Sequence, residues 1–181
     1  MLILVTGGSG SGKSAFAEDR ILSLGDGYRL YIATMFPFDE ESHKRIERHR
    51  QMRSGKGFDT LECYTGLSRV SLPQNCVVLL ECMSNLTANE MFQPDGAHEH
   101  TVSEILSGVK NLMEHAKHVV IVTNEIFSEA ASYEGETELY QRYLGEINCE
   151  VANLADEVVE VVYGIPIYQK RGGNLDEKSL E

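Results

Sequence analysis

A glycine-rich segment near the start of the chain constrains its fold more than any other feature. The segment reads Gly7-Gly8-Ser9-Gly10-Ser11-Gly12-Lys13-Ser14, which matches the P-loop pattern Gly-x-x-x-x-Gly-Lys-Ser/Thr. It lies between an apolar run, Leu2–Thr6, and a helical pattern, Lys13–Leu24. Glycines let the backbone wrap around phosphate oxygens, and loop amides at a helix N-terminus supply a fixed positive potential. We therefore predict a nucleoside triphosphate site in which Lys13 reaches the β- and γ-phosphates and Ser14 coordinates Mg²⁺.

Short apolar runs alternate with helical patterns along most of the chain. The runs are nearly continuous in apolar residues, as is typical of strands buried on both faces of a parallel sheet. We predict strands at Leu2–Thr6, Leu30–Thr34, Val77–Leu80, His118–Thr123 and Glu157–Tyr163, with a weaker one at Thr60–Tyr64. Apolar spacings of three and four predict long helices over residues 102–116 and 139–154. This alternation predicts a single α/β domain, residues 1–171, followed by a polar tail, residues 172–181.

Composition restricts the classes of partner. The 181 residues carry a net charge of −12, which argues against general attraction to nucleic acid or to an anionic membrane. No apolar run approaches the roughly 20 residues that cross a bilayer, and the first residues lack the basic flank of a signal peptide. The four cysteines show no C-x-x-C pair and no zinc-ligand spacing, so we expect reduced thiols in a cytoplasmic protein.

A P-loop enzyme also needs an acidic group near its metal ion, usually at the end of a neighbouring strand. The run Val77–Leu80 ends in Glu81, and a second apolar run is followed by Asn124 and Glu125. Both have the required form, and an ordinary solvent-facing glutamate is the alternative for each. We favour Glu81 as the carboxylate that binds Mg²⁺ together with Ser14.

Basic residues gather in one stretch of this otherwise acidic chain. Six of the sixteen Lys and Arg residues lie between positions 44 and 56, most of them in Glu40–Arg53, which has helical propensity but few apolar positions. One interpretation is a solvated helix held by pairs such as Glu41–Arg45. The other is an anion-binding element that leans over the P-loop, in which His49, with an arginine on either side, acts as a nucleophile toward phosphorus. A lone histidine is more often structural, so these residues alone leave both interpretations open.

With these segments in place, the chain resembles the bifunctional adenosylcobinamide kinase/adenosylcobinamide-phosphate guanylyltransferase family of cobalamin biosynthesis. Many families share the P-loop, but the Tyr-Ile-Ala-Thr and Arg-Ile-x-x-His segments are more specific. The matching segments run in order along nearly the whole chain: Ile3–Ser14, Tyr31-Ile-Ala-Thr34, Arg45-Ile-x-x-His49-Arg50, Thr60-x-Glu62-Cys63, Leu79-Leu-Glu-Cys82 with Asn89, Val122-Thr-Asn-Glu125, Gly145-x-x-Asn148, Ala155-Asp-Glu-Val158 and Gly164-x-Pro166.

The resemblance implies a fold, a function and a set of site residues. It implies a RecA-like P-loop NTPase fold, three-layer α/β/α with a mainly parallel sheet, and a homotrimer. It implies phosphorylation of adenosylcobinamide, followed by transfer of GMP from GTP, through guanylylated His49, to adenosylcobinamide phosphate. ATP, GTP and Mg²⁺ are the implied cofactors. The implied nucleotide contacts are the P-loop together with Thr34, Arg50, Gln51, Met52, Arg53, Glu62 and Glu81.

Two segments depart from the family pattern. The chain lacks the usual Gly-x-Gly-x-x-Pro loop from Ile126 onward, where we expect a long exposed loop over Phe127–Thr137, and Tyr140-Gln141-Arg142 replaces Phe-Arg-Asp. Two other functions therefore stay open: a P-loop kinase of another small hydroxyl substrate without a covalent intermediate, and a non-catalytic nucleotide-binding regulatory protein. His98 and His100 alternate in a polar stretch, where we expect a surface loop rather than a metal site.

Overall fold

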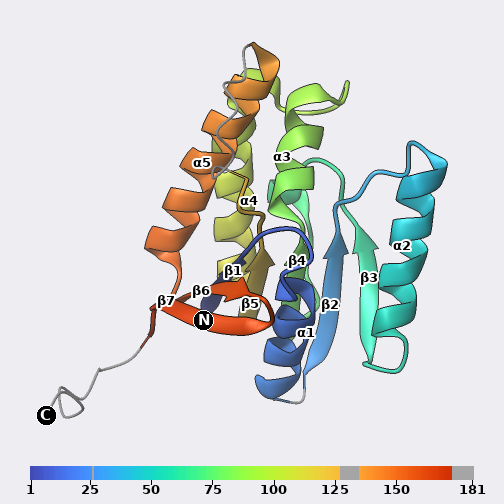
Figure 1. The fold of residues 1–181 in the computed structure, drawn as a ribbon, viewed down its shortest axis with the longest axis vertical. Helices are drawn as coiled ribbons and strands as arrows, with labels where there is room; N and C mark the ends of the chain where they lie inside the picture. Colours follow the sequence, from blue (N-terminus) through green and yellow to red (C-terminus); the bar gives the residue numbers. More distant parts are fainter. Residues whose placement is uncertain (26, 127–134, 173–181) are drawn as a thin grey trace, which may run out of the picture.

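The computed structural model describes residues 1–25, 27–126 and 135–172. Seven strands form one sheet in the order β3-β2-β4-β5-β1-β6-β7 (Figure 1). All neighbouring strands are parallel except for the β6–β7 hairpin. The mainly parallel α/β sheet that the sequence predicts is therefore confirmed. The strands are β1 Leu2–Thr6, β2 Tyr28–Ala33, β3 Phe58–Glu62, β4 Cys76–Glu81, β5 His118–Val122, β6 Glu157–Val162 and β7 Ile165–Lys170.

Helices cover both faces of the sheet. In β1, Leu2 and Leu4 belong to the cluster packed with α3, α4 and α5, whereas Ile3 and Val5 belong to the cluster packed with α1. This alternation follows from the twofold side-chain period of a strand, and it gives three layers. The described helices are α1 Lys13–Ser23, α2 Glu40–Arg53, α3 Met83–Phe92, α4 Thr101–His115 and α5 Glu136–Leu154, with short 3₁₀ turns η1 Leu67–Arg69 and η2 His98–His100.

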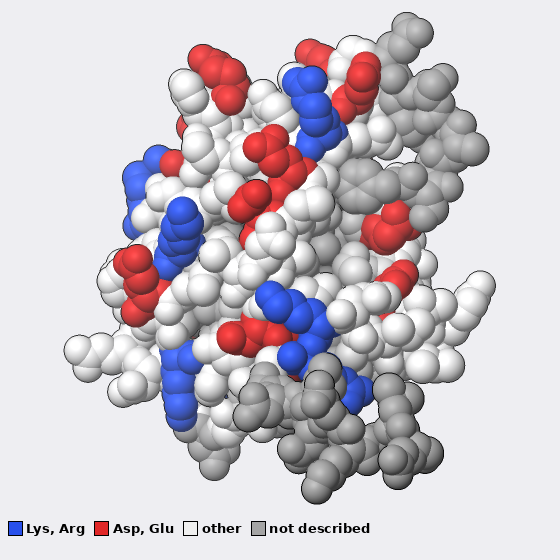
Figure 2. Space-filling model, turned by 90° about the vertical axis from the view of Figure 1, so that its left-hand side faces the viewer, with Lys and Arg blue, Asp and Glu red and all other residues white. Residues whose placement is uncertain are grey.

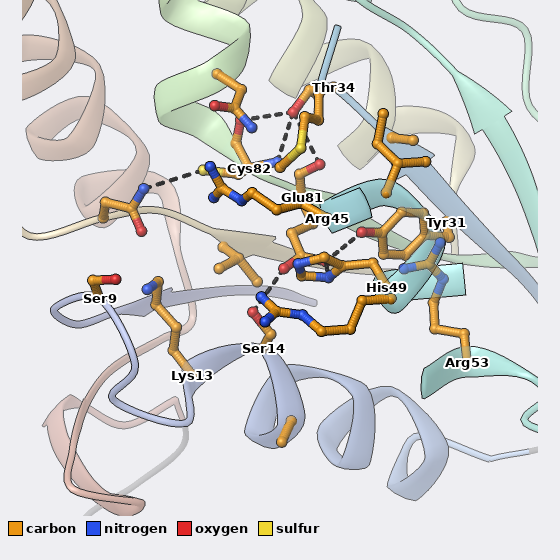
Figure 3. A pocket seen from close by; sticks show the side chains of 18 of the residues that line it. Ser9, Lys13, Ser14, Tyr31, Thr34, Arg45, His49, Arg53, Glu81 and Cys82 are labelled. Atoms are coloured by element: carbon orange, nitrogen blue, oxygen red, sulfur yellow. Dashed lines mark hydrogen bonds and ion pairs between the residues drawn. The ribbon is translucent and has the colours of Figure 1, made fainter. Parts of the chain in front are cut away.

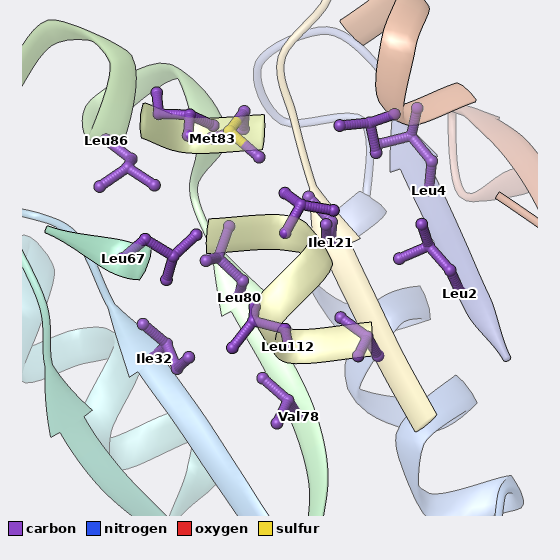
Figure 4. Close-up of a cluster of buried hydrophobic side chains, with 14 of the residues drawn as sticks. Leu2, Leu4, Ile32, Leu67, Val78, Leu80, Met83, Leu86, Leu112 and Ile121 are labelled. Carbon is purple, nitrogen blue, oxygen red and sulfur yellow. The ribbon is translucent and has the colours of Figure 1, made fainter. Parts of the chain in front are cut away.

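The larger core cluster lies on the α3, α4 and α5 face of the sheet. Leu80 and Ile121 from the central strands and Leu86 and Leu112 from the helices are completely buried there (Figure 4). On the opposite face, Ile21 of α1 is equally buried against the sheet. Burial of each such aliphatic side chain stabilises the fold by about 1.5–3 kcal/mol. The carboxyl ends of β1, β2 and β4 are thus fixed by packing on both faces.

The predicted elements match the structure with shifted ends. The strand predicted from Leu30 begins at Tyr28, and the helix predicted to end at Leu24 ends at Ser23. The sequence analysis did not predict helix α3. It also did not predict strand β7, in which every residue is exposed. Residues 127–134, most of the predicted loop Phe127–Thr137, lie outside the described residues. The predicted tail also lies outside them, apart from residue 172. The domain boundaries therefore stay a prediction.

The surface around α5 and β7 carries charges of both signs. Figure 2 shows Lys and Arg side chains interspersed with Asp and Glu on this side of the molecule. The densest run of basic residues in the sequence lies elsewhere, on α2. Across the described parts of the chain, no helix has the length and apolar character needed to span a membrane.

Candidate active site

The P-loop joins β1 to α1 in backbone conformations that its glycines permit. Gly12, the residue before α1, has a φ of 91°, a left-handed conformation that other residues rarely adopt. A Cβ atom on Gly12 would lie 3.3 Å from the Cα of Gly164, in the β6–β7 turn. The Gly164 N–H also donates to the Ser11 carbonyl at 2.8 Å. The hairpin therefore supports the P-loop from one side, which the sequence analysis did not predict.

Lys13 and Ser14 lie at a cavity of about 780 Å³ that is lined by the P-loop and by the ends of β2 and β4. The Lys13 Nζ donates to the Gly8 carbonyl at 3.0 Å. Burial lowers the pKa of Lys13, and nearby Cys82 and Glu81 partly offset this effect. A cavity of this size is typical of a small-molecule or cofactor site. The structure thus places the predicted cationic and hydroxyl groups of the P-loop where a triphosphate would lie.

Glu81, at the end of β4, links the P-loop to α2. Its Oε1 accepts a hydrogen bond from Ser14 Oγ at 2.6 Å, and its Oε2 accepts one from the Tyr31 hydroxyl (Figure 3). His49 Nδ1 lies 3.6 Å from the same Oε2. Burial raises the pKa of Glu81, but contact with His49 and hydrogen bonds from Ser14 and Tyr31 outweigh burial and hold this pKa at about 2. Glu81 is therefore a carboxylate at neutral pH.

The spacing of Ser14 and Glu81 fits a magnesium ion. Adjacent ligands in an octahedron with bonds of 2.0–2.1 Å lie about 3 Å apart, close to the 2.6 Å between Ser14 Oγ and Glu81 Oε1. Glu125, the second acidic candidate, lines the same cavity. Among the described residues, no three His, Cys, Asp or Glu side chains form a metal-binding group. A magnesium ion here would thus draw its other ligands from phosphate oxygens and water.

Helix α2 presents one basic face to the cavity. Asp39 and Ser42 form a capping box at its N-terminus. Arg45, His49 and Arg53, spaced four residues apart, lie on the face that lines the cavity (Figure 3). On the exposed side, Glu40 pairs with Lys44 at 3.6 Å, whereas Arg45, which the solvated-helix interpretation paired with Glu41, lines the cavity. These positions favour the anion-binding interpretation of the basic stretch.

Thr34 holds the backbone at the end of β4. Its hydroxyl lies 2.9 Å from the carbonyls of Glu81 and Cys82, which share its one proton, and accepts from the Cys82 N–H at 2.7 Å. The Asn89 side chain donates to the Thr34 carbonyl at 2.8 Å. Thr34 is completely buried, so the contacts seen here position Glu81.

Of the remaining predicted nucleotide contacts, Arg50, Arg53 and Glu62 line the cavity, whereas Gln51 does not. Arg50 and Glu62 both line the cavity and pair with each other at 3.0 Å, with about half of each side chain exposed. Arg53 is buried, with its guanidinium carbon 3.3 Å from the ring centroid of Tyr31. Gln51 is exposed and donates to Glu47 at 3.2 Å, away from the cavity lining. The Met52 side chain lies outside the described part of the structure.

Tyr31 and Arg45 are site residues that the sequence analysis did not predict. Tyr31 is 4% exposed, and burial followed by the charge of Glu81 raises its pKa far above the usual range, so its hydroxyl remains a donor. The only local signal is a tyrosine between Leu30 and Ile32 in the apolar part of β2. His98 and His100 behave as expected for a surface segment: His98 Nδ1 lies 3.0 Å from the Met91 carbonyl, and His100 is exposed.

The parallel sheet, the P-loop and the carboxylate at the end of β4 together define a P-loop NTPase fold of the RecA-like kind. The solved ATPase of a type III secretion system of pathogenic bacteria superposes with a TM-score of 0.51, at 12% identity over 88% of this chain and 51% of that chain. A Pyrococcus horikoshii OT3 protein, PH0250, superposes with a TM-score of 0.50, at 9% identity over 96% of this chain and 87% of that chain. At such low identities, these similarities show the fold alone.

Sequence comparison identifies the family. Residues 3–168 match the family model described as CobU, cobinamide kinase / cobinamide phosphate guanyltransferase. The bifunctional adenosylcobalamin biosynthesis proteins CobU of Escherichia coli (strain K12) and Salmonella typhimurium (strain LT2) are 35% and 33% identical to this chain. Each match covers 92% of this chain and 98% of the relative. The chain belongs to this family, as the resemblance implied, and it is a transferase.

Proposed function

We propose that this chain is an adenosylcobinamide kinase and adenosylcobinamide-phosphate guanylyltransferase of cobalamin biosynthesis. The family match supports both activities, and one structural observation carries the proposal. The Glu81 carboxylate bridges Ser14 of the P-loop, at 2.6 Å, and His49 of α2, at 3.6 Å. A nucleotide held by the P-loop would therefore lie in the same cavity as the imidazole.

In the guanylyl transfer, His49 is the nucleophile toward the α-phosphorus of GTP. A bond forms between the imidazole nitrogen and phosphorus, the bond from phosphorus to the bridging oxygen breaks, and pyrophosphate leaves with the electron pair. A phosphate oxygen of adenosylcobinamide phosphate then attacks the same phosphorus and releases His49, giving adenosylcobinamide-GDP. Arg45 and Arg53, on either side of His49 along the helix face, stabilise the charge that develops on the phosphate oxygens.

In the kinase reaction, the P-loop positions the terminal phosphate of ATP or GTP. Lys13 contacts the β- and γ-phosphates, and Ser14 and Glu81 would hold a Mg²⁺ ion, which would supply further positive charge beside these phosphates. The γ-phosphoryl group passes to the hydroxyl of the aminopropanol arm of adenosylcobinamide. Because His49 takes no covalent part in this step, the two reactions can be separated by mutation.

The test is labelling of the protein with α-labelled GTP and Mg²⁺, followed by mapping of the modified residue by mass spectrometry. We expect an acid-labile, base-stable adduct on His49, none in His49→Ala, and a normal adduct in His43→Ala, whose histidine is exposed on the same helix. His49→Ala should still transfer the γ-phosphoryl group to adenosylcobinamide. Equal labelling of His49→Ala would refute the mechanism. Phosphoryl transfer to another hydroxyl substrate without any adduct would support the alternative kinase, and nucleotide binding without turnover would support a regulatory protein.

We also propose that the enzyme is a cytoplasmic homotrimer that binds no nucleic acid. The family resemblance supports the trimer, and the net charge of −12 argues against nucleic acid binding. Light scattering coupled to size exclusion should give three times the 20.2 kDa chain mass. A monomeric mass at micromolar protein concentrations would contradict the proposed trimer, but it would not contradict the proposed reactions.

A further inference from the structure

Tyr31 contacts both a carboxylate and an arginine of the candidate site, although no step of the chemistry above uses it. Its hydroxyl donates to Glu81 Oε2, the oxygen that lies 3.6 Å from His49 Nδ1. The face of its ring carries the Arg53 guanidinium, with the central carbon 3.3 Å from the ring centroid. One buried side chain thus touches two charged groups through two different parts of its structure.

We propose that Tyr31 is a positioning residue for the guanylylation of His49, an inference that rests on the function proposed above. The Tyr31 hydroxyl fixes Oε2 of Glu81 so that this oxygen accepts the Nδ1–H of the neutral imidazole. His49 then presents Nε2 to the α-phosphorus. The aromatic ring has a separate role, because it holds Arg53 beside the nucleotide phosphates.

The hydrogen bonds at Glu81 support the first role. Ser14 occupies Oε1 at 2.6 Å, which leaves Oε2 for Tyr31 and His49. In a neutral imidazole, one nitrogen carries the proton and the other carries the reactive lone pair, and the hydrogen bond made by the first nitrogen decides which is which. Nδ1 faces Oε2 of Glu81 at 3.6 Å, so a proton carried on Nδ1 leaves the reactive lone pair on Nε2.

The guanylylation step balances with these groups alone. The bond from Nε2 to the α-phosphorus forms, the bond to the bridging oxygen breaks, and pyrophosphate leaves with the electron pair. The Nδ1 proton stays on the ring, where the negative charge of Glu81 stabilises the positive charge that the ring acquires. A carboxylate that rotated away from His49 would lose this stabilisation in the transition state.

The surroundings of Arg53 support the second role. Arg53 is 7% exposed, and its Nη1 is buried without a hydrogen-bond partner among the described residues. The π-face of Tyr31 is therefore a principal contact of this cation, and it supplies the attraction that holds the guanidinium at the cavity wall. Loss of the ring should disturb phosphate binding, whereas loss of the hydroxyl alone should not.

The experiment compares Tyr31→Phe, Tyr31→Leu and the control Tyr28→Phe. Tyr28 lies on the same strand and the nearby Asp59 carboxylate raises its pKa, but it is 44% exposed. The measurements are the single-turnover rate of adduct formation with α-labelled GTP, the Kd for GTP and the melting temperature. We expect Tyr31→Phe to slow adduct formation about 10- to 100-fold with the Kd within about twofold of wild type. Tyr31→Leu should weaken GTP binding about fivefold in addition, and Tyr28→Phe should match wild type.

The possible failures are distinguishable. Adduct formation by Tyr31→Phe at the wild-type rate refutes the positioning role while leaving the proposed function intact. A parallel fall in rate, GTP affinity and melting temperature in Tyr31→Phe shows a merely structural tyrosine and also refutes the role. A wild-type protein that forms no adduct refutes the proposed guanylyl transfer itself, and the inference with it.

Discussion

Helices α1 and α2 border the same cavity, yet they are held in place in different ways. On α1, Ala17 and Ile21 are completely buried against the sheet. On α2, the buried residues among the described side chains are Ser42 and Arg53, both polar. Helix α2 relies on its capping box, on the stacking of Arg53 over Tyr31, and on a 2.5 Å ion pair between Lys56, just beyond the helix, and Glu18 of α1.

This difference separates the P-loop part of the site from the part that carries His49, the proposed nucleophile. Burial of a side chain such as that of Ile21 on α1 contributes about 1.5–3 kcal/mol, whereas an exposed pair such as Glu40–Lys44 on α2 contributes about 1 kcal/mol or less. Regions with few buried apolar contacts open locally, below the free energy of global unfolding. We therefore expect the P-loop and α1 to stay in place while α2, with His49, opens more readily. The predictions that follow test this contrast.

The largest effect should come from Lys13→Ala. Lys13 is the cation closest to the predicted β- and γ-phosphates, so both transfer reactions should fall about 10³-fold in kcat/KM. Lys44→Ala is the control, since its side chain is 74% exposed on the outer side of α2 and should leave both rates unchanged. A loss confined to one reaction would show that the two activities use different nucleotide sites, and the division between α1 and α2 would need revision.

A matched pair of isoleucines should show the contrast in stability. Ile21 of α1 is completely buried, whereas Ile46 of α2 is only half-buried. We expect Ile21→Ala to lower the free energy of unfolding by about 2–4 kcal/mol, because a buried cavity remains. Ile46→Ala should lower it by less than about 1 kcal/mol. Urea unfolding measures both, and similar losses would mean that α2 is part of the core after all.

The sequence predicts the phosphate-binding part of the site better than the rest, for a physical reason. The P-loop and Glu81 each follow directly from local patterns: a glycine-rich turn between strand and helix, and an apolar run that ends in a carboxylate. The role of Tyr31 depends on β2 lying beside β4, where Tyr31 pairs with Leu79. The support of Ser11 by Gly164 depends on β6 lying beside β1. Strand order arises from long-range packing, which local periodicity does not encode.

The missed elements have the same origin. Every residue of β7 is exposed, so no buried face marked it as a strand. Helix α3 buries polar as well as apolar residues, and the buried polar residues include Thr87 and Asn89. Its amphipathic pattern is therefore weak. Helix α2, in contrast, was predicted with its observed ends, because helical propensity and caps are local properties even where packing is sparse.

The cap of α2 should have a smaller effect that is confined to that helix. Asp39→Ala removes the acceptor of the Ser42 N–H, at 2.7 Å, so we expect amide exchange in α2 to speed up about fivefold, with α1 unchanged. Hydrogen bonds from Ser42 hold the pKa of Asp39 below its usual value of 3.8. The stabilisation is therefore complete above pH 3.8 and is lost as the pH falls through the lower folded value. Exchange corrected for intrinsic rates should show wild type and variant converging at acid pH, and convergence at neutral pH would contradict the cap.

The smallest effect concerns the exposed pair between Arg50 and Glu62, which joins α2 to β3 at 3.0 Å with about half of each side chain exposed. Solvent screens such a pair, so a double-mutant cycle of Arg50→Ala and Glu62→Gln should give a coupling free energy of about 0.2–1 kcal/mol. At 1 M salt, where the Debye length is about 3 Å, the coupling should become negligible. A coupling of several kcal/mol that persists in salt would mean that α2 is fixed to the sheet as firmly as α1. Electrostatic contacts would then hold the proposed nucleophile, His49, in place. The two helices would differ in the composition of their buried residues but not in their stability.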